Sequence, residues 1–111
     1  MKAIIKRVGE IPELVDLPET ARAMQKIIGG PVQVIGSEVC SGNFVVAKDP
    51  ALNSLPYNCG AEGHKFYGTI IYTGPWAGEF TDAGKDAINR YRSQAIYGNR
   101  GAKRWVWAWQ H

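Results

Sequence analysis

The stretch "ETARAMQKIIGGPVQVI", residues 19–35, decides the predicted fold, because it passes from a helix directly into a strand. Thr20 can cap the start of the helix, and Gly29-Gly30 with Pro31 ends it. Its apolar residues recur at helical spacing: Ala21, Met24, Ile27 and Ile28. The β-branched run "VQVI", residues 32–35, then predicts a strand. A helix with one apolar face must lie on a sheet, so this stretch predicts a packed helix and sheet.

Further strands are predicted on both sides of this stretch, where short runs of β-branched and aromatic residues lie between turn-forming residues. They cover Lys2–Val8, Pro12–Leu17, Asn43–Lys48 and Gly68–Gly74. Between the last two, "DPALNSLPYNCGAEGHKF" (residues 49–66) indicates a long irregular loop. Loops of that length in small domains are usually functional or mobile.

A second helix is predicted within "EFTDAGKDAINRYRSQAIYGNRG", residues 79–101. Thr81 is a suitable N-cap, and Gly98 would end the helix. The expected buried stripe is Ala87, Ile88, Tyr91, Ala95 and Ile96. A final strand with all its indoles on one face is predicted for the tryptophan-rich segment that follows.

Hairpins combined with separate helices predict the α+β class, with an antiparallel or mixed sheet and two helices packed against it. The 111 residues suffice for one small domain, with residues 1–97 as the core and residues 98–111 as a basic, tryptophan-rich C-terminal segment. Helices on one face of the sheet would leave the other face to solvent or to a second subunit.

The composition is that of a folded globular protein, with 45% hydrophobic and 21% charged residues. The longest apolar runs are far short of the roughly 20 residues that cross a bilayer. We therefore expect a soluble, cytoplasmic protein without a membrane partner. Cys40 and Cys59 are too few for a disulfide framework, so each is expected to be a small, partly buried hydrophobe.

Catalytic and metal-binding patterns are weak. One could assemble Cys59, His64 and Glu62 into a nucleophilic triad, but three such residues in one loop occur often by chance. No C-x-x-C or H-x-x-x-H pair and no phosphate-binding glycine motif is present. The sequence predicts a protein that is not an enzyme and that has no metal site and no cofactor.

The C-terminal segment "GNRGAKRWVWAWQH", residues 98–111, gives the strongest binding signal. Its alternating indoles follow directly on cations: Trp105, Trp107 and Trp109 come after Arg100, Lys103 and Arg104. Such a surface could stack a nucleobase and bind phosphate. The alternative is a strand buried on the sheet or in a dimer interface, where Trp is enriched. Either way, a ligand or another subunit should cover the three indoles.

The long loop supplies the second group of candidate ligand-binding residues. "YNCGAEGHKFYG", residues 57–68, combines glycines with rings and a cation, as an anion-binding turn does. The ordinary alternative is a turn whose aromatic residues pin the loop to the sheet. The candidates are Tyr57, Asn58, His64 and Lys65.

The order and spacing of several segments resemble one family. "MKAIIKRVGEIPELVDL", "ETARAMQKIIGGPVQVI", "DPALNSLPYN", "FYGTIIYTG" and the "FTD" before the last helix are similar to the phage and mobile-element family called domain of unknown function 3846. The resemblance spans roughly Met1 to Ser93 and does not reach the tryptophan-rich segment. It transfers no catalytic residue. It implies a setting in which short proteins neutralise a host defence component or sequester a signal molecule.

Together these features predict a non-enzymatic, homo-oligomeric binding protein. The first hypothesis is a counter-defence sponge that sequesters a small anionic, nucleotide-like signal molecule. The second is a protein-interaction module that inhibits a host defence factor. The third is a single-stranded nucleic-acid binder, although a net charge of +3 is low for that role.

Overall fold

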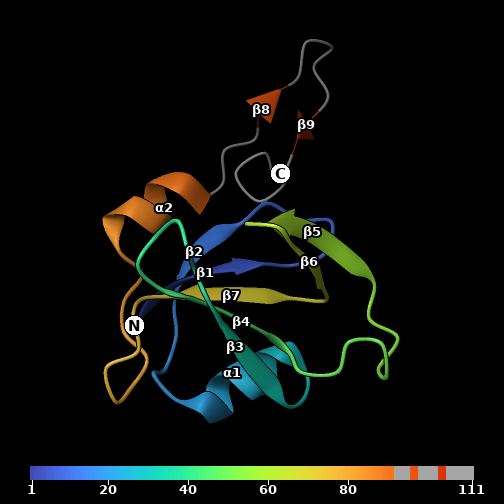
Figure 1. Cartoon of the computed structure of the whole chain (residues 1–111), viewed down its shortest axis with the longest axis horizontal. Coiled ribbons are helices and arrows are strands. Elements are labelled where there is room, and N and C mark those ends of the chain that lie inside the picture. The colour runs from blue at the N-terminus through green and yellow to red at the C-terminus, as the bar shows by residue number, and fades with distance from the viewer. Residues whose placement is uncertain (92–95, 98–102, 105–111) are drawn as a thin grey trace.

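The computed structural model describes residues 1–91, 96–97 and 103–104, the last two pairs by their backbone (Figure 1). Its main feature is a five-stranded, wholly antiparallel sheet in the order β2-β1-β7-β4-β3. The strands are β1 (Lys2–Lys6), β2 (Glu13–Asp16), β3 (Val32–Gly36), β4 (Asn43–Ala47) and β7 (Ile70–Thr73). The α+β class and five of the six predicted strands are therefore confirmed. The sixth, predicted for the alternating tryptophans of the C-terminal segment, lies outside the described residues.

Helix α1 (Ala21–Ile28) forms where the sequence predicts it. The Thr20 hydroxyl accepts a hydrogen bond from the Ala23 amide, and Gly29 ends the helix with φ of 97°, a left-handed conformation that glycine adopts freely. Met24 and Ile28 are buried. They pack in one apolar cluster with Ile5 and other residues from the same face of the sheet.

Helix α2 (Lys85–Tyr91) is shorter than predicted and begins later. Thr81 is not its N-cap, because the Thr81 hydroxyl donates to the Pro75 carbonyl oxygen across the preceding loop. Ala87 and Tyr91 are buried as predicted. Ile96 was predicted to continue the helix, but it belongs to a two-residue strand, β8 (Ile96–Tyr97), which pairs with β9 (Lys103–Arg104).

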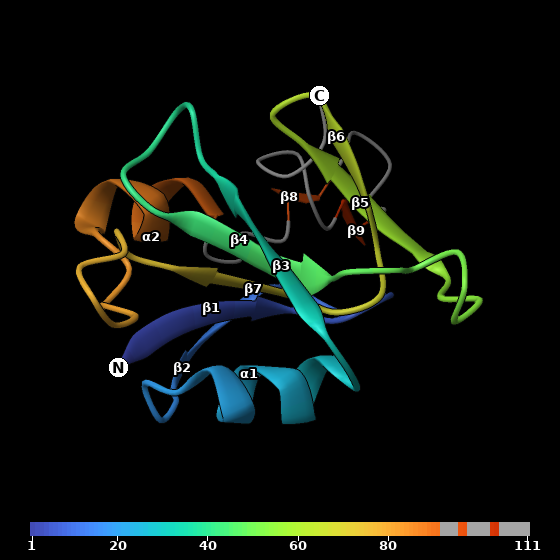
Figure 2. The same cartoon turned by 60° about the horizontal axis from the view of Figure 1, so that its bottom comes forward.

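The two helices lie on opposite faces of the sheet (Figure 2). Alternating side chains of the central strands explain this arrangement: Ile5 and Ile71 pack with α1, whereas Ile4 and Tyr72 share a second cluster with α2. The expectation that both helices cover one face and leave the other open is therefore wrong.

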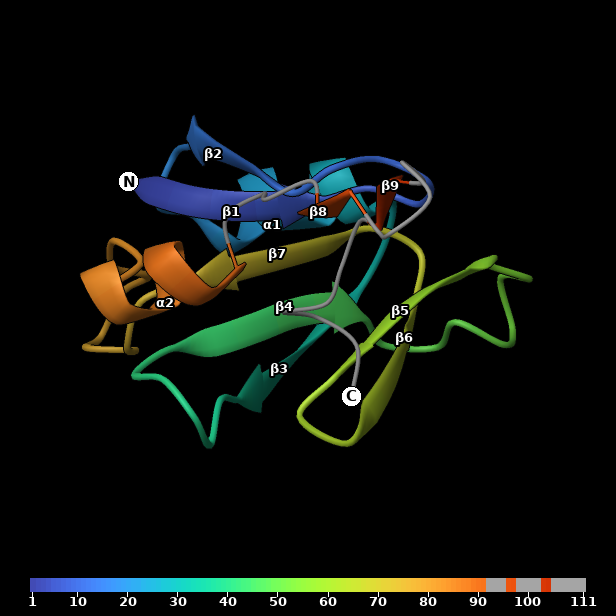
Figure 3. The ribbon, with the colours of Figure 1, turned by 90° about the horizontal axis from the view of Figure 1, so that it is seen from above.

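The segment predicted as an irregular loop contains a β-hairpin. Strands β5 (Tyr57–Ala61) and β6 (His64–Tyr67) pair with each other and cross the face of the sheet that α2 also covers (Figure 3). Glu62 and Gly63 form its two-residue turn, both with positive φ, 52° and 81°, as a type I′ turn requires. Cys59 and Phe66 point from the hairpin into the core.

Four aromatic rings form the centre of this second cluster. Phe44 contacts Phe66, Tyr72 and Tyr91 at centroid distances of 5.1, 5.0 and 5.7 Å. Phe44 thereby joins β4 to the hairpin, to β7 and to α2. Gly42, just before β4, allows the chain to pass close by, since a Cβ there would lie 2.7 Å from the Tyr72 hydroxyl oxygen.

We predict that Phe44→Ala lowers the free energy of unfolding by about 3–5 kcal/mol, because it leaves a cavity where three rings meet. Urea denaturation followed by circular dichroism measures the change. Leu52→Ala is the control: its side chain is 82% exposed, and the expected change is within about 0.5 kcal/mol. Equal effects of the two substitutions would contradict this account of the core.

Candidate functional site: a groove between the sheet edge and the hairpin

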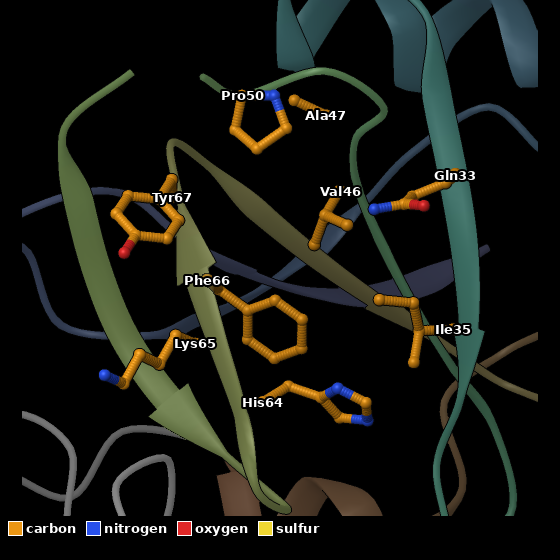
Figure 4. A pocket seen from close by; sticks show the side chains of 9 residues that line it. All are labelled: Gln33, Ile35, Val46, Ala47, Pro50, His64, Lys65, Phe66 and Tyr67. Carbon is orange, nitrogen blue, oxygen red and sulfur yellow. The ribbon is translucent and has the colours of Figure 1, made fainter. Parts of the chain in front are cut away.

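A groove of about 220 Å³ lies between the sheet edge and the hairpin (Figure 4). Its sheet side comes from β3 and β4, and its hairpin side comes from β6. The lining residues are Gln33, Ile35, Val46, Ala47, Pro50, His64, Lys65, Phe66 and Tyr67. Its apolar floor is bordered by a few polar groups, as in small-ligand sites, but its volume is below the roughly 300–1,000 Å³ of sites that enclose a whole drug-sized ligand.

The alternation of β6 determines which of its side chains face the groove. His64 and Phe66 point toward Ile35 and Val46, whereas the Lys65 ammonium points away from them (Figure 4). The His64 imidazole stacks on the Phe66 ring with a centroid distance of 5.8 Å and an interplanar angle of 27°. The groove thus presents a flat, partly exposed ring surface, with the Gln33 amide opposite it.

The hairpin is held in place by the Glu62 carboxylate in its turn. This carboxylate accepts four hydrogen bonds: from the Ser37 and Tyr91 hydroxyls and from the backbone amides of Glu38 and Val39, at 2.5–3.2 Å. The donors come from the segment between β3 and β4 and from α2. Partial burial alone would raise the pKa of Glu62, but the four hydrogen bonds outweigh it and lower the pKa.

The base of the hairpin is attached to β1 by Asn58 and Lys6. Asn58 is the extra residue of a β-bulge, which turns its side chain toward β1. Its amide group donates to the carbonyl oxygens of Lys6 and Gly68, and its carbonyl oxygen accepts from the Lys6 ammonium at 2.9 Å. Burial lowers the pKa of Lys6, while interactions with Cys59 and Glu10 oppose the shift.

The four candidate ligand-binding residues predicted within residues 57–68 therefore have different places in the structure. His64 and Lys65 line the groove, as predicted, although only His64 faces its interior. Asn58 belongs to the attachment of the hairpin. Tyr57 lies outside the lining and pairs with Tyr67 across the hairpin, ring to ring, at 5.5 Å.

The C-terminal candidates cannot be placed in this geometry. Arg100, Trp105, Trp107 and Trp109 lie outside the described residues, and Lys103 and Arg104 are described by their backbone alone. Sequence reasoning missed Gln33, Ile35 and Val46, which it treated as ordinary strand residues, and it considered Phe66 and Tyr67 only as rings of the long loop. The only signal for the strand residues is alternation, which places Gln33 and Ile35 on one face of β3.

The imagined triad of Cys59, His64 and Glu62 is not assembled. Cys59 is fully buried, and burial raises the pKa of its thiol to about 11, with Lys6 opposing the shift. His64 is exposed and stacks on Phe66, and the Glu62 carboxylate is engaged by its four donors. Within the described part of the chain, no group of three or more His, Cys, Asp or Glu residues is placed to hold a metal ion.

The geometry defines a small α+β domain with a groove between a sheet edge and a hairpin. The sequence model of the family described as "Domain of unknown function (DUF3846)" matches residues 1–96, and the chain belongs to this family. No curated protein and no solved structure matches the chain. None of the described helices is long and apolar enough to span a membrane.

We predict that Glu62→Gln lowers the free energy of unfolding at pH 7 by about 1–3 kcal/mol, because charge-assisted hydrogen bonds are lost. Since folding lowers the pKa of Glu62, its contribution is present above the unfolded-state pKa of about 4.3 and is lost as the pH falls through the lower folded-state pKa. The gap between the wild type and the variant should therefore narrow in acid, which urea titrations from pH 3 to 7 measure.

The matched control is Glu79→Gln, which removes an exposed carboxylate from the loop before α2. It should leave stability within about 0.5 kcal/mol of the wild type at every pH. A Glu62→Gln effect that is absent at pH 7, or that grows as the pH falls, would show that the carboxylate does not hold the hairpin.

Proposed function

We propose that the protein is a non-enzymatic binding protein that sequesters a small nucleotide-like ligand, with the planar ring of the ligand in the groove. The observation that carries the proposal is the His64–Phe66 stack on an apolar floor. An aromatic or imidazole face binds a nucleobase by stacking, which contributes about 1–3 kcal/mol per base. The Gln33 amide can donate to and accept from the edge of such a ring.

We assign the contacts with the negative charge of the ligand to the basic C-terminal segment. Lys65 points away from the groove, so within the described lining no ammonium or guanidinium faces the ring site. From Lys85 onward the chain has six basic residues and one acidic residue, Asp86. We propose Arg100, Lys103 and Arg104 as the phosphate contacts, because phosphate attracts clustered cations, and the indoles of Trp105, Trp107 and Trp109 as a cover for the ligand.

The biological part of the proposal is a counter-defence role, in which a phage-encoded protein lowers the concentration of a host signal by binding it in the cytoplasm. It rests on the setting that the family resemblance implies. A sponge needs affinity and no turnover. The buried Cys59 thiol and the fully engaged Glu62 carboxylate suit such a protein better than an enzyme that uses them.

A second candidate function is a protein-interaction module that inhibits a host factor. The observation that favours it is Trp76, which is 58% exposed on the loop before α2 and held by Phe80 at a centroid distance of 5.0 Å. Exposed, pre-positioned tryptophan is a common anchor in protein interfaces. A single-stranded nucleic-acid binder is the third alternative, and it predicts affinity that grows with oligonucleotide length.

We predict that calorimetry with a panel of mono-, di- and cyclic nucleotides detects binding, and that His64→Ala weakens it about 5- to 150-fold, the equivalent of about 1–3 kcal/mol of lost stacking. Lys26→Glu, on α1 at the opposite face of the sheet, is the control and should bind like the wild type. His64 is exposed, so circular dichroism should report an unchanged fold for the variant.

The same calorimetric assay tests whether the C-terminal segment contacts the negative charge of the ligand. Deletion of residues 101–111 should abolish binding, and Arg104→Glu should weaken it far more than Lys2→Glu. No binding of any nucleotide to the intact protein would favour the protein-inhibitor function instead. If the truncated protein bound nucleotides as tightly as the full chain, the C-terminal segment would not be part of the site.

A further inference from the structure

The outer edge of β3 is unusually open. β3 ends the sheet order, and no other described strand pairs with its outer side. Its sequence, "VQVIG", contains neither a charge nor a proline, two of the features that protect an edge strand from pairing with another chain. The opposite edge strand, β2, has charged residues at both ends, Glu13 and Asp16, and prolines on both sides. β3 has a proline on one side only, Pro31, which lies before the strand and outside its outward-facing backbone groups.

The hydrogen bonds at the two ends of the β3–β4 ladder fix the direction of each backbone group. The Ser37 amide donates to the Gly42 carbonyl oxygen at 2.9 Å, and the Lys48 amide donates to the Pro31 carbonyl oxygen at 3.0 Å. In an antiparallel pair, residues with inward and outward backbone groups alternate along the strand. The residues whose N–H and C=O groups point outward are therefore Val32, Val34 and Gly36.

We propose that β3 pairs antiparallel with β3 of a second copy of this chain, about a two-fold axis at Val34. The outward-facing residues then match: Val34 lies opposite its own copy, and Val32 lies opposite Gly36 of the partner. Each matched pair exchanges two N–H···O=C bonds, as in any antiparallel ladder. The contact is self-complementary and closes after two copies, which is the commonest symmetry of soluble oligomers.

Side chains and charges favour antiparallel pairing of β3 with β3 of a second copy. Val34 is 49% exposed, and the pairing covers it with the partner's valine, an apolar cross-strand contact. Exposed Glu38 follows one end of β3, and exposed Lys48 lies beside the other end. Antiparallel pairing brings the Glu38 end of one copy to the Lys48 end of its partner, whereas parallel pairing would bring like charges together.

The pairing has a consequence for the groove. Gln33 and Ile35 line the groove from the other face of β3, so a continuous sheet places the two grooves on the same face, one on each side of the seam. This consequence rests on the proposed function. The pairing itself does not, because it follows from the open edge alone.

The test is sedimentation velocity of the full chain at increasing micromolar concentrations, with Val34→Pro as the variant. Proline at residue 34 removes an outward N–H and leaves the β3–β4 ladder intact, so the domain should still fold. Asp16→Pro is the matched control, because the Leu17-to-Met1 bond, at 2.8 Å, gives residue 16 an outward N–H on the opposite edge. Val34→Lys is a second variant that keeps the backbone unchanged.

The wild type and Asp16→Pro should reach twice the mass of the 12.2 kDa chain, while Val34→Pro and Val34→Lys stay at that of one chain. If the circular dichroism of Val34→Pro shows that this variant does not fold, the mass of Val34→Lys decides whether β3 pairs with a second copy. A monomeric wild type across the concentration series, or a wild-type oligomer that neither Val34 variant dissociates, overturns the pairing. Calorimetry on the monomeric variants shows separately whether nucleotides still bind.

Discussion

The position of the β5–β6 hairpin depends on the Glu62 carboxylate. An isolated two-stranded hairpin is marginally stable in water, so this one needs contacts outside itself. Glu62 supplies them at the turn through four hydrogen bonds, and Asn58 supplies them at the base through β1. With both ends held, Phe66 lies in the core and His64 lies at the wall of the groove.

The sheet provides the second half of the arrangement. β1, β7 and β4 are buried on both faces, and their alternating side chains serve two separate apolar clusters. One cluster holds α1, and the other holds α2 and the hairpin together. Because the hairpin covers the second face only in part, the outer strand β3 remains accessible, and the groove forms between β3 and the hairpin.

Most of the sheet and α1 could be predicted from the sequence, because their signals are local. β-branched runs mark β1, β4 and β7, and a capped amphipathic stretch marks α1. The hairpin could not be predicted in this way, since Asn58 and Gly60 are poor strand formers and its turn uses Glu62 where Asn or Asp is usual. Its stability comes from contacts that are distant in the sequence.

The start of α2 was mispredicted for a related reason. Thr81 has the chemistry of an N-cap, but tertiary structure engages its hydroxyl with Pro75 instead. In the candidate site, residue type identified His64 and Lys65, whereas Gln33, Ile35 and Val46 join them only because the sheet edge and the hairpin meet in space. No local pattern indicates that meeting.

The central claim is that the groove between the β3 edge and the hairpin binds the ring of a nucleotide-like ligand. The most direct test is a two-dimensional amide NMR titration of the ¹⁵N-labelled full chain with AMP, ADP and cyclic AMP in turn. The account predicts that saturable shifts for at least one of them concentrate on Gln33, Ile35, Val46, His64 and Phe66. Shifts confined to the α1 face, or none at millimolar nucleotide, would contradict it.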